Sequence, residues 1–510
     1  MVRPPQSGRA TAWLPWLGLF AATVVLRAVR FGTVFQDGAL HTLYAADEFY
    51  HLRRIWFTVV NFPASLDFDL YLNHPHGAPP IWPPFFDWGI AALARVLAGA
   101  EDQRAVEVVA AWVPPVLGGL AVLASAALVR RVHSAAAGWL TGVLLAVLPA
   151  HFAVSQLGEV DHHVAVGLLA TWLVGSAAGL AGAEPGATRW AAVRTGALAA
   201  AAIGLWPGAL LHALVIQAFL LGQMLLTSAR ADVAARARSL ALLHAIAAAL
   251  LLPFCIGNEW AQFGNWSPQV LSRFQPLWFA AGAATLAVAS GAWGLGVGET
   301  RRQRLGAALL LAALGAAALW LGVPGLAESL DRAAGWFGGE AFLAAVAETR
   351  PLLFPAGAAF DPQPAQRQFT WLFWLLPIGL AGLVSHAVRR RRSDALLVWT
   401  AAAVACGAVL AQLRFRDVAA LGFAWVMGPA LVEAGRALGR FARAPRPVWL
   451  GIVVVTLLAA ALPGLRRAGE GFEASRAARR GSPPERSGEA WLRLALRDLG
   501  EWAHDNTPPT

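Results

Sequence analysis

The chain has 510 residues, of which 57% are hydrophobic and only 14% are charged, and this excludes an ordinary soluble globular protein. The formal net charge is +10, and all 40 basic residues are arginines. These arginines fall in short clusters between apolar stretches, as in the cytoplasmic loops of membrane proteins, which excludes a nucleic-acid-binding protein. The two cysteines, Cys255 and Cys406, lie inside apolar stretches, so neither a disulfide framework nor a thiolate metal site is expected.

The apolar stretches predict an all-α, multi-pass membrane protein. A membrane-spanning helix needs about 20 mostly apolar residues, and by that rule we expect roughly thirteen spans. They lie near 11–30, 105–130, 135–154, 162–182, 188–205, 207–227, 239–256, 276–296, 304–325, 369–388, 395–412, 417–437 and 447–465.

The arginine clusters orient these spans. If the N-terminus is cytoplasmic, every second loop should be rich in arginine, because such loops stay inside. The clusters around Arg130, Arg236, Arg302, Arg390 and Arg440 all fall in those loops, and shifting the count by one span would place all five outside. This parity predicts that 31–104, 155–161, 257–275, 326–368, 413–416 and the residues after about 466 lie outside.

Two of the outer segments are long, and both are expected to be functional. The first, 31–104, follows the first span and contains a short amphipathic stretch, 85–99, which we interpret as an interfacial helix. The second, 326–368, follows the ninth span and is expected to be a mobile loop. We therefore expect a transmembrane catalytic domain over 1–466, followed by a polar linker and a short amphipathic helix over 467–510.

The stretch Gly158-Glu159-Val160-Asp161-His162-His163 is anomalous, because it places ionisable side chains between two apolar stretches. Such groups are costly at membrane depth and usually line a cavity, a relay or a catalytic site. The alternative is a loop of solvated charges just outside the lipid. An aspartate and a histidine two residues apart can both ligate a metal, but two residues do not make a site.

Further ionisable residues converge on the same predicted outer face. Asp47 follows the first span, Glu348 lies in the long loop, and Arg414 begins a short outer turn. Carboxylates together with an imidazole suit Mg²⁺ or Mn²⁺, and a guanidinium nearby is a ready phosphate ligand. A metal site and a set of unrelated solvated charges both remain open at this point.

The order of these motifs resembles the catalytic subunit of oligosaccharyltransferase, the membrane enzyme that transfers an oligosaccharide from a polyprenyl carrier to asparagine. The resemblance covers nearly the whole chain. It is carried by Asp47-Glu48-Phe49-Tyr50-His51, His74-Pro75-His76-Gly77, Trp82-Pro83-Pro84-Phe85-Phe86-Asp87-Trp88, Gly158-x-x-Asp161-His162-His163, Glu348-x-x-Pro351 and Arg414-Phe415.

The resemblance implies a GT-C-type glycosyltransferase fold and a role for each matching residue. Asp47, Asp161 and His163 would hold Mn²⁺ or Mg²⁺, while Asp47 and Glu348 would act on the acceptor amide. Arg414, Glu348 and His162 are expected to contact substrate, and Glu159 is expected to play a supporting part or to face solvent. The implied partners are a polyprenyl-linked oligosaccharide, an acceptor polypeptide and the lipid bilayer.

The sequence departs from the family pattern in three places. The Ser or Thr usually found three residues before the loop glutamate is Ala345 here. The arginine usually found seven residues before the aspartate of the second motif is Val154 here. The Trp-Trp-Asp-Tyr-Gly motif, which in the family reads the Ser or Thr of the acceptor sequon, is absent. We therefore expect a chain that lacks the soluble C-terminal domain, whether by truncation or by nature.

The favoured function is a metal-dependent transfer of oligosaccharide to asparagine on the outer face of a prokaryotic plasma membrane. One alternative is a polyprenyl-phosphate-sugar-dependent transferase with a lipid, glycan or hydroxyl acceptor, which the missing sequon reader favours. A second alternative is a non-enzymatic transporter for a lipid-linked sugar. Transporters tend to place ionisable residues at mid-membrane, whereas here they cluster at one face.

Overall fold

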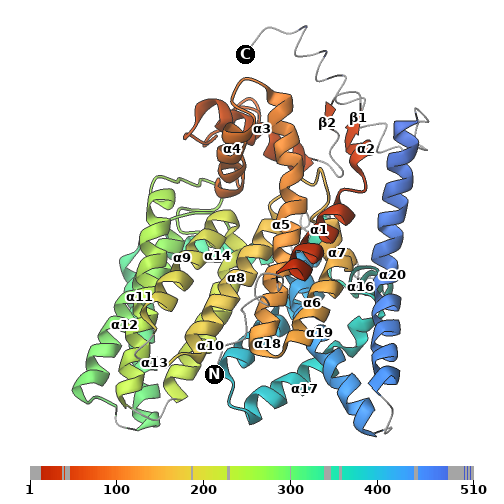
Figure 1. Cartoon of the computed structure of the whole chain (residues 1–510). Coiled ribbons are helices and arrows are strands. Elements are labelled where there is room, and N and C mark those ends of the chain that lie inside the picture. The colour runs from red at the N-terminus through yellow and green to blue at the C-terminus, as the bar shows by residue number, and fades with distance from the viewer. Residues whose placement is uncertain are drawn as a thin grey trace, which may run out of the picture.

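The computed structural model is a helical bundle with a small helical cap at one end (Figure 1). It describes residues 13–36, 39–40, 46–184, 188–226, 230–298, 300–337, 346–354, 359–441, 446–480, 499, 502 and 506. Within these ranges, ten helices are long and apolar enough to cross a membrane. They are α5 (Gln103–Val132), α8 (His163–Gly182), α10 (Leu210–Leu226, preceded by the turn η2, Pro207–Ala209), α11 (Arg230–Cys255), α12 (Phe274–Leu295), α13 (Arg301–Gly322), α17 (Leu376–Arg389, preceded by η5, Trp371–Leu375), α18 (Ser393–Ala411), α19 (Arg416–Phe441) and α20 (Arg446–Arg479).

Three shorter helices account for the remaining predicted spans: α1 (Leu14–Arg27), α6 (Ala135–Val147) and α9 (Arg189–Leu205). Every stretch that the sequence predicts as a span thus contains a helix, and the polytopic all-α fold is confirmed. The count of thirteen stays a prediction, because α1, α6 and α9 are shorter than each of the ten spans above when η2 is counted with α10 and η5 with α17. One boundary differs clearly, since α20 continues to Arg479 although the last span was expected to end near 465. The first part of the expected linker, 467–479, is therefore helical.

Helix ends follow the capping residues that the sequence supplies. The Asp102 carboxylate accepts hydrogen bonds from the backbone N–H groups of Arg104 and Ala105 at the start of α5. The Ser134 hydroxyl accepts one from Ala137 at the start of α6, and Thr300 with Gln303 forms a capping box at the start of α13. Each cap satisfies backbone donors that have no partner within the helix.

The cap is built from the first predicted outer loop. It contains α2 (Phe31–Val34), the two-residue antiparallel strands β1 (Phe35–Gln36) and β2 (Ala39–Leu40), α3 (Ala46–Asn61) and α4 (Phe85–Leu97). Figure 1 shows α3 and α4 beyond the end of the bundle. They pack on each other and on α5, through a small core that includes Ile55, Val59 and Ile90. The predicted interfacial segment 85–99 is thus a helix of this cap.

The second long outer segment also contains ordered structure. Its described residues form α14 (Leu326–Phe337), η3 (Ala347–Thr349) and α16 (Gln363–Phe369). The turn η3 packs against η6 (Leu413–Phe415), which immediately precedes α19. The short amphipathic helix expected within 467–510, after the polar linker, falls almost entirely outside the described residues.

Close helix packing makes one glycine a test of the fold. A Cβ atom on Gly196 in α9 would overlap the carbonyl oxygen of Leu243 in α11 and lie 3.1 Å from Ile246 Cβ. Gly196→Ala should therefore destabilise the protein by about 1–3 kcal/mol, the usual range for overpacking. Thermal unfolding in detergent measures this.

Gly291→Ala in α12 is the matched control, because nothing lies within 4 Å of the added atom. Alanine favours a helix over glycine, so this control should leave the midpoint unchanged or raise it. Equal midpoints for the two variants would contradict the α9–α11 packing.

Candidate metal and substrate site

The anomalous stretch Gly158–His163 connects α7 (Pro149–Ala153) to α8 and is held by two other helices. The Leu157 N–H donates to the Arg27 carbonyl of α1 at 3.0 Å, and the Gly158 N–H donates to the Ala111 carbonyl of α5 at 3.1 Å. Gly158 has φ +84°, a conformation that glycine adopts at little cost. The loop is buried, so Asp161 has a fixed position rather than a solvated one.

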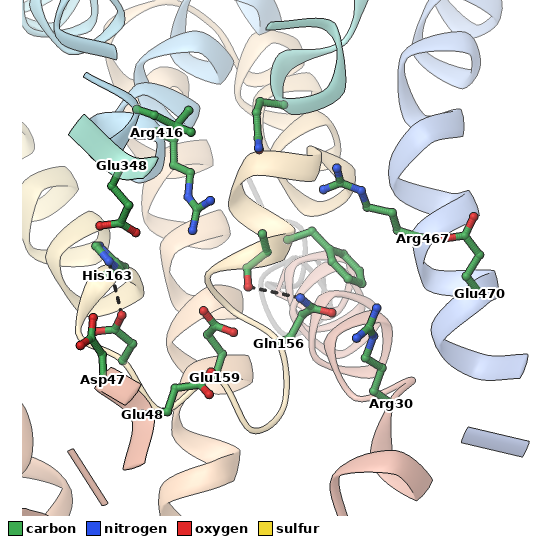
Figure 2. Close-up of a pocket in the computed structure, with 15 residues that line it drawn as sticks. Arg30, Asp47, Glu48, Gln156, Glu159, His163, Glu348, Arg416, Arg467 and Glu470 are labelled. Atoms are coloured by element: carbon green, nitrogen blue, oxygen red, sulfur yellow. Dashed lines mark hydrogen bonds and ion pairs between the residues drawn. The ribbon is translucent and has the colours of Figure 1, made fainter. Parts of the chain in front are cut away.

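This loop forms the floor of a cavity of about 640 Å³ (Figure 2). Asp47, Asp161, His163 and Glu348, which the sequence analysis singled out, all line it. They come from α3, the Gly158–His163 loop, the start of α8, and η3. Segments separated by up to three hundred residues thus bring the predicted metal ligands and the predicted loop glutamate to one cavity. The remaining lining residues are Arg30, Glu48, Phe152, Ala153, Gln156, Glu159, Gln368, Leu413, Arg416, Arg467 and Glu470.

The two oxygens of Asp161 face different surroundings. Oδ2 lies 3.4 Å from His163 Nε2, on the cavity wall. Oδ1 lies 2.6 Å from His162 Nδ1 and 3.4 Å from His51 Nε2, and it accepts a hydrogen bond from the His162 N–H. Burial would raise the pKa of Asp161, but the neighbouring His163 and His162 outweigh it and hold that pKa well below its usual value. Asp161 is therefore an anion with one oxygen presented to the cavity.

His51 belongs to a chain of contacts behind Asp161 that the sequence analysis missed. Its Nδ1 lies 2.6 Å from Asp87 Oδ1, and Asp87 Oδ2 in turn lies 2.9 Å from Arg54 Nη1. Burial would lower the pKa of His51, but Asp87 and Asp161 raise it to about 9. The cation formed below that pH orients the Oδ1 side of Asp161. The sequence did contain a pattern that points to His51. Asp47 and His51 are four residues apart, and residues with that spacing share one helix face.

Two triads could hold a divalent ion. His51, Asp161 and His162 place one donor atom each within 4.8 Å of one another. Asp47, Asp161 and His163 are the ligands that the sequence predicts. We favour the second triad, because its residues line the cavity whereas His51 and His162 are buried behind Asp161. Asp87 also stabilises the protonated form of His51, which has no lone pair to offer a metal.

Asp47 and Asp161 bring two negative charges to the same cavity. Burial, followed by the charge of Asp161, raises the pKa of Asp47. Figure 2 shows Asp47 close to His163, with Glu348 above both. A cation between the carboxylates would relieve this repulsion, and the oxygen and nitrogen donors fit Mn²⁺, Mg²⁺ or Zn²⁺. The donor types of this triad therefore suit a divalent ion.

The remaining expected residues lie around this centre. Glu159 is buried and lines the cavity, and burial with the charges of Glu48 and Asp161 raises its pKa well above the usual value, so solvent exposure was wrong for it. His162 is also buried and lies behind Asp161 rather than on the cavity wall. Arg414 in η6 adjoins η3 but does not line the cavity, whereas Arg416 does.

The structure brings the predicted loop glutamate to the cavity through a backbone contact. The Leu413 N–H donates to the Arg350 carbonyl at 2.9 Å, which ties η3 to η6. Glu348 consequently interacts electrostatically with Arg414 and with His163. Asp417, which the sequence analysis did not select, is the second acidic neighbour of His163, at 3.6 Å from its Nδ1. His163 is thus held between Asp161 and Asp417.

Paired variants test the contacts behind Asp161. Asp87→Asn removes the anion that keeps His51 protonated and should weaken Mn²⁺ binding by roughly 10–100-fold, as for other residues that orient metal ligands. Titration calorimetry on the purified protein measures this. Asp69→Asn is the matched control, because Asp69 is buried and paired with Arg53 of α3, the helix that carries His51, but lies outside the cavity. Equal Mn²⁺ affinity in the two variants would show that His51 does not orient Asp161.

Comparison with known proteins places this geometry in context. Residues 19–266 match the model of the family described as oligosaccharyl transferase STT3, N-terminal. Dolichyl-phosphooligosaccharide-protein glycotransferase 1 of Archaeoglobus fulgidus is 32% identical over 149 residues, which is 29% of this chain and 24% of that protein.

Solved structures share the fold. The archaeal oligosaccharyltransferase AglB from Archaeoglobus fulgidus, in complex with an inhibitory peptide and a dolichol-phosphate, superposes with a TM-score of 0.78 at 21% identity. The match covers 98% of this chain and 58% of that one. The oligosaccharyltransferase of the same organism in complex with Zn and sulfate has a TM-score of 0.71 at 21% identity, over 97% and 55% of the two chains. This chain therefore spans less than two thirds of the proteins it matches, and the expected GT-C-type membrane fold is confirmed.

Proposed function

We propose that this chain, whose residues 19–266 match the family model of oligosaccharyl transferase STT3, transfers an oligosaccharide from a polyprenyl-(pyro)phosphate carrier to the side-chain amide of an acceptor asparagine. The observation that carries the proposal is the cavity, where Asp47, Asp161, His163 and Glu348 meet several arginines. The name of the Archaeoglobus relative describes this reaction type, and a structural neighbour binds an inhibitory peptide and dolichol-phosphate.

Asp47, Asp161 and His163 would hold the divalent ion, Mn²⁺ or Mg²⁺. When bound there, the ion would supply positive charge to offset the charge that develops on the leaving phosphate. The neighbour that contains Zn and sulfate supports both a metal and an anion in this fold. In this chain, Asp87 and His51 would keep Asp161 Oδ1 fixed while Oδ2 faces the cavity.

Asp47 and Glu348 would act on the acceptor. An amide nitrogen is a poor nucleophile, because its lone pair is delocalised into the carbonyl group. Two carboxylates that accept its N–H hydrogen bonds favour rotation about the C–N bond, which frees the lone pair for attack on the sugar carbon. Glu348 lines the cavity from the second long outer segment, and this segment would close over bound acceptor and help to exclude water.

Arginines would hold the donor phosphates. Arg30, Arg416 and Arg467 line the cavity, and Arg414 lies beside Glu348. Guanidinium groups bind phosphate oxygens through paired N–H donors. Arg416 is the arginine at the start of α19 that reaches the cavity, so we assign it to the donor phosphate together with Arg414. The arginine distribution of the loops supports an outward-facing position for this end of the bundle, and we assign the membrane as a prokaryotic plasma membrane.

Activity measurements test the proposal. Purified protein is incubated with lipid-linked oligosaccharide, an Asn-x-Thr peptide and Mn²⁺, and glycopeptide is quantified by mass spectrometry. Glu348→Gln keeps the size of the side chain but removes its charge, and it should lower the rate at least 100-fold, as does loss of other groups that act at the reacting centre. Chelator, or Asp161→Ala with His163→Ala, should abolish product.

Glu328→Gln is the matched control, because Glu328 lies in the same outer segment and is ion-paired with Arg332 at the surface. It should retain full activity. Equal activity with and without chelator would refute the metal site. Sugar appearing on a hydroxyl or lipid acceptor while the peptide stays unmodified would refute the asparagine acceptor.

A further inference from the structure

A second cavity, of about 490 Å³, lies between α5, α8 and α9. It shares no lining residue with the cavity around Asp161. Gly175 and Ser176 of α8 line this cavity. At a rise of 1.5 Å per residue, they lie about 18 Å along the helix from His163. Arg131, the penultimate residue of α5, also lines it. This cavity is therefore at the opposite end of the bundle from the proposed active site, in the half that the arginine clusters assign to the cytoplasmic leaflet.

Two guanidinium groups converge inside this cavity. Arg131 Nη2 donates to the Gly175 carbonyl at 2.6 Å, and Arg194 Nε donates to Ser176 Oγ at 3.0 Å. A Cβ atom on Gly179 would lie 3.7 Å from Arg194 Nη2 and 3.8 Å from Arg131 Nη1. Both guanidinium groups thus lie near Gly179 of α8, and each is held there by a hydrogen bond to that helix.

No carboxylate of the described residues forms an ion pair with either arginine. Asp394 interacts electrostatically with Arg131, but its two oxygens are bound by Arg392, through Nε at 2.9 Å and Nη2 at 2.8 Å. Arg131 and Arg194 therefore place two positive charges together with several uncommitted N–H donors. Both arginines are exposed at the cytoplasmic end of the bundle, where the headgroup of an anionic lipid can reach them.

The other walls of the cavity are apolar. Leu128 of α5, Trp172 of α8 and Leu198 of α9 line it, and all three lie farther from the membrane surface than the arginines. Trp172 is 45% exposed on the outside of the bundle. The cavity is therefore cationic toward the membrane surface and apolar toward the membrane interior. That gradient matches a phospholipid, whose phosphate sits above its acyl chains.

We propose that Arg131 and Arg194 form a binding site for the phosphate of an anionic membrane lipid in the leaflet opposite the active site. Basic pockets between transmembrane helices on the cytoplasmic side favour such headgroups. The phosphate would lie over Gly179 and bridge both guanidiniums, and an acyl chain would lie along Leu128, Trp172 and Leu198. The site ties α5 to α8 and α9, so a bound lipid should stabilise this part of the bundle.

Native mass spectrometry of the delipidated full-length chain tests the proposal, with phosphatidylglycerol and phosphatidylcholine as probes. We expect phosphatidylglycerol to bind at least tenfold more tightly than phosphatidylcholine, and Arg131→Gln with Arg194→Gln to abolish this preference. Arg389→Gln with Arg390→Gln is the matched control, because it removes two exposed arginines near the same membrane face and should leave the preference intact.

Gly179→Asp covers the case in which the arginine variants fail to fold. It keeps both arginines and places a carboxylate between them, where the added Cβ has ordinary contact distances. It should abolish phosphatidylglycerol binding while the melting temperature without lipid stays equal or rises. The proposal is overturned if Gly179→Asp binds the lipid as the parent does, or if both lipids bind equally. It is also overturned if inorganic phosphate at millimolar concentration stabilises the protein as much as phosphatidylglycerol does.

Discussion

The site depends on one carboxylate that is held from both sides. Asp161 Oδ1 is engaged by His51 and His162, while Oδ2 faces His163 and the cavity. Asp87 supplies the negative charge that stabilises protonated His51, and His51 in turn contacts Asp161. Asp87 therefore influences the position of Asp161 without lining the cavity. An aspartate fixed in this way presents one oxygen in one direction. A metal ligand needs this fixed direction. The proposed roles of Asp47 and Glu348 depend on where Asp161 holds the ion.

Backbone contacts fix the loop that carries Asp161. The loop before it is bonded to carbonyl groups of α1 and α5, and α8 begins two residues later. These helices are apolar and span the bundle, so burial of their surfaces supplies rigidity to a loop that carries ionisable groups. Asp47 and Glu348 reach the cavity from an outer cap and an outer turn, which is where motion on substrate binding is least costly.

The sequence was informative where a local pattern or a membrane rule applied. Apolar length and arginine parity placed a helix at every expected span and put Asp47, Asp161 and Glu348 at one end. The contacts of His51 with Asp87, and of His163 with Asp417, could not be derived in the same way. They join segments that are distant in the chain, and their geometry depends on how α3, α4 and α19 pack. Glu159 shows the same limit, because a charge in a loop reads as solvated until the surrounding helices are placed.

The claim that Asp161 presents one oxygen to a divalent ion is tested most directly by anomalous diffraction from Mn²⁺-loaded crystals. The account predicts one manganese peak in the cavity, about 2.0–2.6 Å from an oxygen of Asp161 and from one of Asp47, and about 2.0–2.3 Å from His163 Nε2. A peak between His51 and His162, or no peak within ligand distance of Asp161, would contradict it.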